Sequence, residues 1–248
     1  IEANKDLNDK LIFKGGFVLL KTLASDRFTR DLDALAREID KEKVVPLVEK
    51  ALKIHLNDGL FYGTPEISDL TDQGDYGGYR IHVPFEIGEL PNDERKLKKL
   101  SRVHLDIGFG DVVFGRVKRT NVPTILESQE PISWKVYPLE CIYAEKLQTL
   151  VSRGAANSRA KDLYDLVVIF DEVKASKTFS SALRKTFKNR ETELPGSFSE
   201  FVRTLDFTIL ERSWGSVELS GGTMTFGECH KRLLTIMKQV DKLKEVDS

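Results

Sequence analysis

Two aspartates separated by a single residue restrict what this chain can fold into more than any other short stretch. They are Asp31 and Asp33. In a β-strand, side chains two residues apart point to the same face, so the two carboxylates would lie side by side. Their repulsion calls for a cation, most commonly a divalent metal held by oxygen ligands. The pattern predicts a strand over 30–36 that presents a metal site, although acid-x-acid should occur by chance about six times in such a chain.

A glycine pair, Gly15 and Gly16, precedes the aspartates. The apolar run 11–13 before the pair indicates a buried strand, and apolar residues at helical spacing after it indicate a short helix. Such a strand, turn and helix would place backbone N–H groups at a helix N-terminus, where a phosphate is favoured. A plain glycine turn is the alternative interpretation.

The composition favours a globular protein over a disordered one, but the overall charge does not indicate a class of partner. Lys and Arg (38) nearly balance Asp and Glu (39), so any nucleic-acid surface must be local. Two distant cysteines predict neither a disulfide framework nor a zinc site, and a cytoplasmic setting is the simplest. Charged and glycine residues interrupt the apolar run 11–23, so we expect neither a signal segment nor a membrane span there. Because the chain opens on Ile1, native residues are expected upstream.

Further strands are expected before residue 137. The pattern predicts a helix from Asp40 to about 54, and a hairpin of 60–67 and 79–87 around a turn at 71–78. A strand over 102–107 would place His104 and Asp106 on one face, so Asp106 is a candidate third carboxylate, with Asp111 as the alternative. Basic clusters at 95–102 and 116–119 are either solvated faces or contacts to RNA or phosphate.

Helical periodicity replaces the strands from about Tyr137. Helices are expected over 139–150, 159–170, 175–188 and 198–210, with an amphipathic terminal helix that includes 233–243. Lys146 lies inside an apolar stripe, where it either extends to the edge of the core or binds phosphate. Lys161 and Asp165 have the spacing of an intrahelical ion pair. The absence of a dinucleotide fingerprint or a Walker lysine motif excludes the ordinary Rossmann and P-loop classes.

Five segments taken in order resemble the AbiEii-type nucleotidyltransferases, toxins of bacterial toxin–antitoxin and phage-defence systems that include the mycobacterial MenT group. The segments are Lys14-Gly15-Gly16, Arg27-x-Thr29-x-Asp31-Leu32-Asp33, Leu105-Asp106-Ile107, Ala144-Glu145-Lys146-Leu147, and Ser158-Arg159-x-Lys161-Asp162-Leu163-Tyr164-Asp165-Leu166. The chain departs from the wider superfamily at Gly16-Phe17, where Gly-Ser is usual, so no serine hydroxyl assists the phosphate.

The resemblance implies an α+β fold. A polymerase-beta-like nucleotidyltransferase core with a mixed sheet would occupy 1–136, and a helical domain at 137–248 would complete the active-site cleft. It implies a set of site residues: Asp31, Asp33 and Asp106 for Mg2+; Gly15, Gly16, Lys146 and Lys161 for the nucleotide; and Asp31, Asp33, Lys146 and Asp162 for catalysis. Helical projection points Arg159 inward more clearly than Lys161, so Arg159 is included as a further nucleotide contact.

The resemblance also implies a function. We expect a magnesium-dependent toxin that transfers a nucleoside monophosphate from an NTP to RNA, with the 3' end of tRNA as the expected acceptor, and that thereby stops translation. A cognate antitoxin protein is the expected partner. Two alternatives stay open: a nucleotide-binding regulatory module without transferase activity, and a nucleotidyltransferase that acts on a protein or small molecule.

Overall fold

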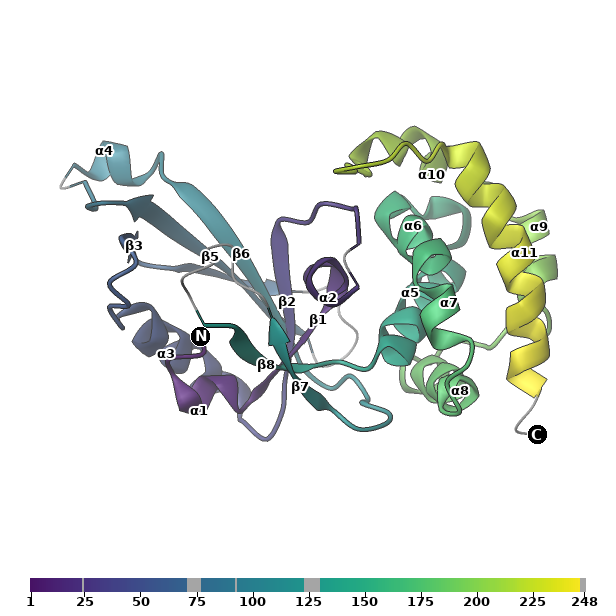
Figure 1. Cartoon of the computed structure of the whole chain (residues 1–248), viewed down its shortest axis with the longest axis horizontal. Coiled ribbons are helices and arrows are strands. Elements are labelled where there is room, and N and C mark those ends of the chain that lie inside the picture. Colours follow the sequence, from purple (N-terminus) through teal and green to yellow (C-terminus); the bar gives the residue numbers. More distant parts are fainter. Residues whose placement is uncertain (24, 71–76, 92, 123–129, 246–248) are drawn as a thin grey trace. The chain divides into compact units, whose positions relative to one another are not determined.

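The computed structural model describes residues 1–23, 25–70, 77–91, 93–122 and 130–245 (Figure 1). The chain forms two compact units. The first comprises Ile1–Leu23, Thr29–Asp111 and Val117–Val136, and the second comprises Ala24–Phe28, Val112–Arg116 and Tyr137–Ser248. Two short segments, 24–28 and 112–116, thus belong with the helices, whereas the sequence analysis included them in 1–136. Long-range contacts bring them there: Arg27 pairs with Asp165, and the Phe114 N–H donates to Cys141 Sγ.

The first unit is built on an eight-stranded mixed sheet, as the α+β prediction requires. The strand order is β3-β5-β6-β2-β1-β8-β7, and β4 also pairs with β5. Strands β2 and β6 run parallel, as do β1 and β8, and the other pairs are antiparallel. The strands are β1 (Leu11–Lys14), β2 (Asp31–Ala36), β3 (Leu60–Tyr62), β4 (Glu66–Leu70), β5 (Gly78–Ile87), β6 (Ser101–Gly108), β7 (Lys118–Val122) and β8 (Ile132–Val136). The helices of this unit are α1 (Lys5–Asn8), α2 (Gly15–Thr22), α3 (Lys41–Leu52) and α4 (Glu94–Leu97).

Most of the expected elements of this unit are present. The strand, glycine turn and helix over 11–22 are confirmed, as are the strands carrying Asp31 and Asp106. The predicted hairpin corresponds to β4 and β5, with β3 paired beside the second half of β5. Of its turn, residues 71–76 lie outside the described residues. Strands β7 and β8 were not predicted. The charged residues at the start of β7 were interpreted as part of a basic cluster.

The central strands give the sheet one apolar and one polar face. Ile81, Leu105 and Ile107 alternate with charged residues along β5 and β6, and all three are buried. Lys41, the first residue of α3, lies 4.8 Å from the centre of the Tyr79 ring on the same face. Helix α3 therefore packs on the apolar side. We call the opposite side, which carries Asp31 and Asp33, the polar face.

The N-cap of α3 lies at the predicted residue, but the side chain there does not make the expected hydrogen bond. Asp40 occupies the N-cap position, as expected, but its side chain makes no capping hydrogen bond. It pairs instead with Lys43 at 2.6 Å. Both side chains are exposed, so this pair adds little to stability.

The second unit is helical. It contains α5 (Leu139–Arg153), α6 (Ala160–Val168), α7 (Phe170–Val173), α8 (Phe179–Asn189), α9 (Phe198–Thr204), α10 (Thr208–Arg212) and α11 (Phe226–Glu245). Helix α5 packs against α6, α7 and α8, and Tyr143 of α5 contacts the rings of Phe170 and Phe179. The single helix expected over 198–210 is divided into α9 and α10, because Leu205, the C-cap of α9, has an extended backbone.

Cys229 and His230 have structural surroundings. Cys229 is a free, buried cysteine, and burial raises the pKa of its thiol to about 12. A neutral thiol is a poor nucleophile and a poor metal ligand. The His230 ring packs against Phe207 and Phe226, at 4.4 and 5.8 Å between ring centres.

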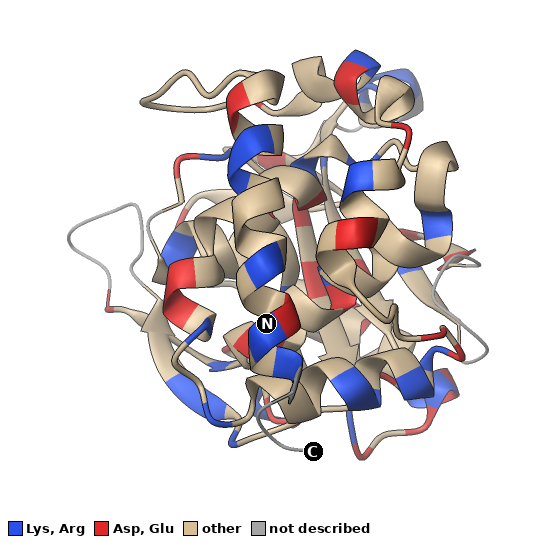
Figure 2. Cartoon of the chain, turned by 90° about the vertical axis from the view of Figure 1, so that its right-hand side faces the viewer, with Lys and Arg blue, Asp and Glu red and all other residues tan. Residues whose placement is uncertain are grey.

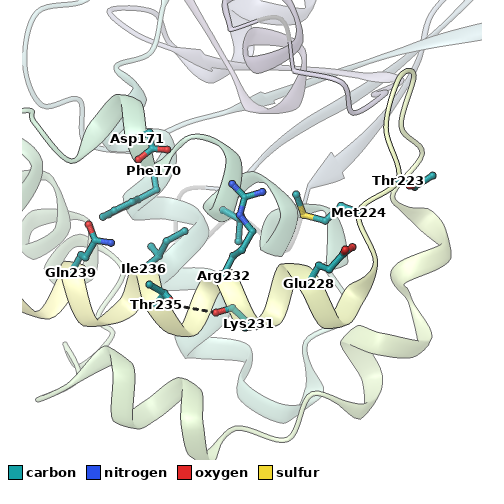
Figure 3. Close-up of a pocket in the computed structure, with 11 residues that line it drawn as sticks. Phe170, Asp171, Thr223, Met224, Glu228, Lys231, Arg232, Thr235, Ile236 and Gln239 are labelled. Atoms are coloured by element: carbon teal, nitrogen blue, oxygen red, sulfur yellow. Dashed lines mark hydrogen bonds between the residues drawn. The ribbon is translucent and has the colours of Figure 1, made fainter.

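A hollow of about 630 Å³ lies beside α11 in the second unit (Figure 3). Apolar side chains, Phe170 and Ile236, line it together with both Glu228 and Arg232. Its mixed lining does not select one chemical class of ligand. Separately, none of the helices in the described part of the chain is both long enough and apolar enough to span a membrane.

Candidate active site

The turn between β1 and α2 holds a carboxylate at a helix N-terminus. Gly15 begins α2 with φ of +75°, a conformation that side chains disfavour. A Cβ atom built on Gly15 would lie 2.1 Å from Asp33 Oδ2, so the Asp33 carboxylate packs directly against the glycine backbone. The positive end of the helix favours a negative charge there. Glycine is thus required here by both its backbone conformation and this close approach.

A row of four charged residues crosses the polar face beside this turn. Lys14 of β1 is the register partner of Asp33 on β2, Asp33 is the partner of Asp106 on β6, and Asp106 is the partner of Arg80 on β5. We call these four residues the charged row. Like charges on directly opposed residues destabilise a sheet, and opposite charges stabilise it. The cations at the two ends therefore offset the repulsion between Asp33 and Asp106.

Asp106 is held at both oxygens. Arg80 Nε donates to Asp106 Oδ1 at 2.8 Å, and Arg80 Nη2 donates to Oδ2 at 2.5 Å. This hydrogen bonding is the main reason that the pKa of Arg80 lies above its ordinary value; the charges of Asp106, Asp31 and Asp33 add to it. The Asp106 side chain is 6% exposed and that of Arg80 is 41% exposed, so the guanidinium lies between the carboxylate and solvent.

The other candidate for a third carboxylate, Asp111, also has a cation. Its Oδ2 lies 2.5 Å from Lys14 Nζ, and both side chains are largely buried. Buried charges of this kind are maintained by their pairing. The structure therefore gives Asp106 and Asp111 separate basic partners, Arg80 and Lys14.

Asp31 lies in the next row of the polar face. Its Oδ1 is 3.3 Å from Nδ1 of His104, its register partner on β6, and the His104 ring contacts the ring of His82 on β5. About half of the Asp31 side chain is exposed. Asp31 is thus much more accessible than Asp106 to a solute that approaches this face.

The donor set fits a magnesium ion that is held by two carboxylates. Asp31 and Asp33 present hard oxygen atoms from one face of one strand. Mg2+ is commonly held by one or two protein carboxylates together with substrate phosphates and water. No cluster of three or more His, Cys, Asp or Glu side chains suited to a metal occurs among the described residues. The predicted role of Asp106 as a third ligand stays a prediction, and its present partner is Arg80.

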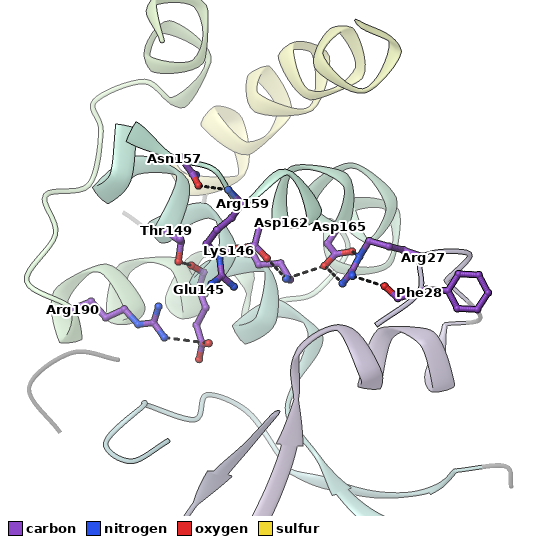
Figure 4. A network of polar contacts seen from close by, with 10 residues as sticks. All are labelled: Arg27, Phe28, Glu145, Lys146, Thr149, Asn157, Arg159, Asp162, Asp165 and Arg190. Atoms are coloured by element: carbon purple, nitrogen blue, oxygen red, sulfur yellow. Dashed lines mark hydrogen bonds and ion pairs between the residues drawn. The ribbon is translucent and has the colours of Figure 1, made fainter. Parts of the chain in front are cut away.

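The second unit contains a network of ion pairs, which we call the α5–α6 network (Figure 4). Lys146 Nζ on α5 lies 2.5 Å from Asp162 Oδ1 and 2.9 Å from Asp165 Oδ2 on α6. Arg27 binds both oxygens of Asp165 at 2.8 and 2.9 Å, and Arg159 Nε binds Asp162 Oδ2 at 2.5 Å. Three cations thus surround two carboxylates.

The pairing favours the charged forms of Lys146, Asp162 and Arg27, as the directions of their pKa shifts show. Burial alone would lower the pKa of Lys146, but Asp162 and Asp165 outweigh it and raise that pKa above its ordinary value. Burial would likewise raise the pKa of Asp162, yet Lys146 and Arg159 bring it well below its usual range. The pKa of Arg27 is raised, because Asp165 outweighs burial. Lys146 is therefore a fully charged buried lysine.

These contacts locate the predicted residues of the second unit. Lys146, Arg159 and Asp162 lie together, whereas Lys161 makes no ion pair with any residue that the structure describes. Asp165 pairs with Arg27 and Lys146, so the possible ion pair between Lys161 and Asp165 is absent. Arg159 is 54% exposed, in contrast to the inward direction that helical projection suggested. It is the N-cap of α6, outside the regular helix to which the projection applies.

Three cations that pair with carboxylates were not predicted to do so: Arg80, Lys14 and Arg27. Arg80 carried a usable signal, because alternation along 79–87 places it and His82 on one face. The pairing of Lys14 with Asp111, and of Arg27 with Asp165, joins residues 97 and 138 positions apart. No local pattern reports contacts over such separations.

Elsewhere on the helices, basic and acidic residues are interspersed (Figure 2).

Comparison with solved structures shows which class of fold this is. JHP933 from Helicobacter pylori is 18% identical, with a TM-score of 0.59 over 99% of this chain and 90% of that one. A putative nucleotidyltransferase from H. pylori is 18% identical, with a TM-score of 0.58 over 100% and 93%. MenT4, a nucleotidyltransferase toxin from Mycobacterium tuberculosis, is 18% identical, with a TM-score of 0.56 over 97% and 77%. The chain therefore has a nucleotidyltransferase fold.

The family follows from a sequence comparison. The family described as "Nucleotidyl transferase AbiEii toxin, Type IV TA system" matches residues 2–217. The chain belongs to this family and is a nucleotidyltransferase toxin of a type IV toxin–antitoxin system. Among curated protein sequences no match was found. The resemblance on which the sequence analysis relied is thus confirmed.

We predict that Lys146→Met destabilises the protein by about 3 kcal/mol, because it removes the cation shared by two buried carboxylates. Lys161→Met is the matched control: it removes a lysine without an ion pair, and should change the free energy of unfolding by about 0.5 kcal/mol or less. Urea denaturation at pH 7 measures both. Equal losses for the two variants would show that the α5–α6 network does not stabilise the second unit.

The lowered pKa of Asp162 predicts a pH dependence. A carboxylate with a lowered folded-state pKa contributes stability above its unfolded-state pKa, and the contribution disappears as pH falls toward the folded value. The stability difference between wild type and Asp162→Asn should therefore be full at pH 7 and shrink below about pH 4. Denaturation at a series of pH values measures it, with the exposed Glu200→Gln as control. A constant difference down to about pH 2 would contradict this.

Proposed function

We propose that this toxin transfers a nucleoside monophosphate from an NTP to the 3' end of a tRNA in the cytoplasm, with Mg2+ as cofactor, and thereby blocks translation. The observation that carries the transferase mechanism is the placement of Asp31 and Asp33 on one face of β2, next to the Gly15 turn. Membership of a nucleotidyltransferase toxin family supports it. The tRNA acceptor and a cognate antitoxin partner are proposed from the family resemblance.

The chemistry requires an acceptor hydroxyl to attack the α-phosphorus of the NTP. A new phosphorus–oxygen bond forms, the bond to pyrophosphate breaks, and the hydroxyl proton leaves to solvent. Bound magnesium would neutralise charge on the entering and departing oxygens. Asp31 and Asp33 would hold it, and the backbone N–H groups at the start of α2 would bind phosphate oxygens. No side-chain nucleophile is needed.

Four residues of the second unit are the remaining candidates for the nucleotide site. The family resemblance assigns Lys146 to the nucleotide phosphates and Lys161 with Asp162 to the last active-site motif, and helical projection adds Arg159 as a nucleotide contact. Lys146 has two carboxylate partners, so we propose that it acts chiefly by holding Asp162 and Asp165 in place. Arg159 has an exposed guanidinium, which suits direct binding of a phosphate.

We predict that Asp31→Asn and Asp33→Asn each lower nucleotide incorporation by roughly two to three orders of magnitude, because each removes a charged metal ligand. The assay incubates purified protein with tRNA and each of four labelled NTPs. Asp69→Asn is the matched control: Asp69 lies on β4 of the same sheet, but its register partner Tyr79 places it on the apolar face. Undiminished incorporation by Asp31→Asn would overturn the mechanism.

The same assay distinguishes the two alternative functions. NTP-dependent thermal stabilisation without incorporation into any RNA would favour a nucleotide-binding regulatory module. A labelled product that forms in whole lysate and resists RNase would favour a protein or small-molecule acceptor. Incorporation into tRNA that depends on Asp31 and Asp33 supports the proposal over both.

We predict that Gly15→Ala lowers activity by much more than its effect on stability would explain. Gly15 and Gly59 both have φ of +75°, so substitution of either by alanine should cost about 1–2 kcal/mol of stability. Only at Gly15 would the new methyl group collide with Asp33, whereas nothing lies within 4 Å of it at Gly59. Displacement of a ligand by about 1 Å can cost about a hundredfold in rate. Gly15→Ala should therefore lose roughly that much activity and Gly59→Ala very little; equal activities would contradict this.

A further inference from the structure

The bidentate pair of Arg80 and Asp106 bears directly on metal binding. Asp33 and Asp106 are register partners on parallel strands, so their side chains leave the same face of the sheet next to one another. By position alone, Asp106 would complete a three-carboxylate metal site with Asp31 and Asp33. Both of its oxygens are bound to Arg80, however, at 2.5 and 2.8 Å. The carboxylate that could be the third ligand is thus already neutralised by the protein.

Arg80 cannot release Asp106 by losing a proton. A guanidinium stays charged at any pH at which the protein is folded, and its planar fork matches a carboxylate better than an ammonium group does. Arg80 is also the solvent-facing member of the pair, since its side chain is 41% exposed and that of Asp106 only 6%. A divalent cation that approached Asp106 would therefore meet a fixed positive charge.

The cation at the other end of the charged row differs from Arg80 in its exposure. Lys14 Nζ lies 2.5 Å from Asp111, and its side chain is 8% exposed. It is buried and has a carboxylate outside the row. Arg80 is therefore the exposed cation of the row. It also interacts electrostatically with the predicted metal ligands, since the charges of Asp31 and Asp33 both act on it.

We propose that Arg80 is a positioning residue that keeps Asp106 out of the metal site, so that Asp31 and Asp33 are the protein's metal ligands and metal affinity is held low. This inference rests on the proposed function, because it concerns the metal of the same site. Low affinity of the free protein leaves a role for the triphosphate, whose oxygens supply the remaining ligands and charge.

The test is a titration with Mn2+ in the absence of NTP and RNA, followed by the electron paramagnetic resonance signal of free Mn2+. Arg80→Gln should bind Mn2+ at least about tenfold more tightly than wild type, because it removes an opposing charge and frees a carboxylate. The matched control is Arg102→Gln. Arg102 lies on β6, the strand next to that of Arg80, with its side chain on the polar face. It binds the two oxygens of Glu66, which is not a predicted metal ligand, at 2.7 Å each. It should change affinity by less than about twofold.

A double-variant cycle separates the freed ligand from a simple charge effect. If Arg80 acts by holding Asp106, the gain from Arg80→Gln should be largely lost when Asp106→Asn is also present. If Arg80 only repels the metal through space, the gain should be the same in both backgrounds, and the inference is wrong. Unchanged or weaker Mn2+ binding by Arg80→Gln also overturns it, as does an absence of Mn2+ binding by both proteins.

A second variant keeps the test decisive if Arg80→Gln fails to fold. Arg80→Lys retains the charge but cannot bind both carboxylate oxygens in a fork. It should raise Mn2+ affinity by a smaller factor that Asp106→Asn again removes, and circular dichroism confirms folding. Because Mn2+ binding needs no turnover, a protein that binds as predicted but incorporates no nucleotide would refute the proposed function and leave this inference standing.

Discussion

The repulsion between Asp33 and Asp106 is the constraint on which the first unit's polar face depends. The two carboxylates are register partners in the middle of the sheet, and Asp106 is buried. Such an arrangement is stable only with compensating charge close by. Lys14 and Arg80 provide it from the strands on either side, and the N-terminus of α2 adds a favourable dipole next to Asp33. The polar face is thus a balanced set of charges in which the position of each cation determines which carboxylates are available.

The second unit also contains buried carboxylates that need compensating charge close by. Its two central carboxylates, Asp162 and Asp165, are on one helix and are buried. Their cations come from three places in the sequence: Arg27, Lys146 on α5, and Arg159 at the start of α6. The network therefore joins α5, α6 and the segment 24–28, which explains why that short segment belongs to the helical unit. Lys146 is at its centre and is as much a structural residue as a candidate for nucleotide binding.

Local patterns in the sequence predicted what is locally determined. Period-two alternation placed Asp31 with Asp33, and His104 with Asp106, and the glycine pair marked the turn from β1 to α2. The same patterns could not show that β2 and β6 are neighbours, because strand order depends on packing of the whole sheet. Nor could they show which cation meets which carboxylate. Lys14 and Asp111, or Arg27 and Asp165, meet only because the chain folds back over about a hundred residues. Where periodicity could not choose among residues, the candidate site residues came from the family resemblance.

We propose that Asp31 and Asp33 hold the catalytic metal while Arg80 retains Asp106. The most direct test is a crystal structure of the protein with Mn2+ and a non-hydrolysable NTP, with manganese located by its anomalous scattering. We expect an anomalous peak within coordinating distance of Asp31 and Asp33, with Arg80 still bound to both oxygens of Asp106. Manganese coordinated by Asp106 with Arg80 displaced, or manganese away from Asp31 and Asp33, would contradict it.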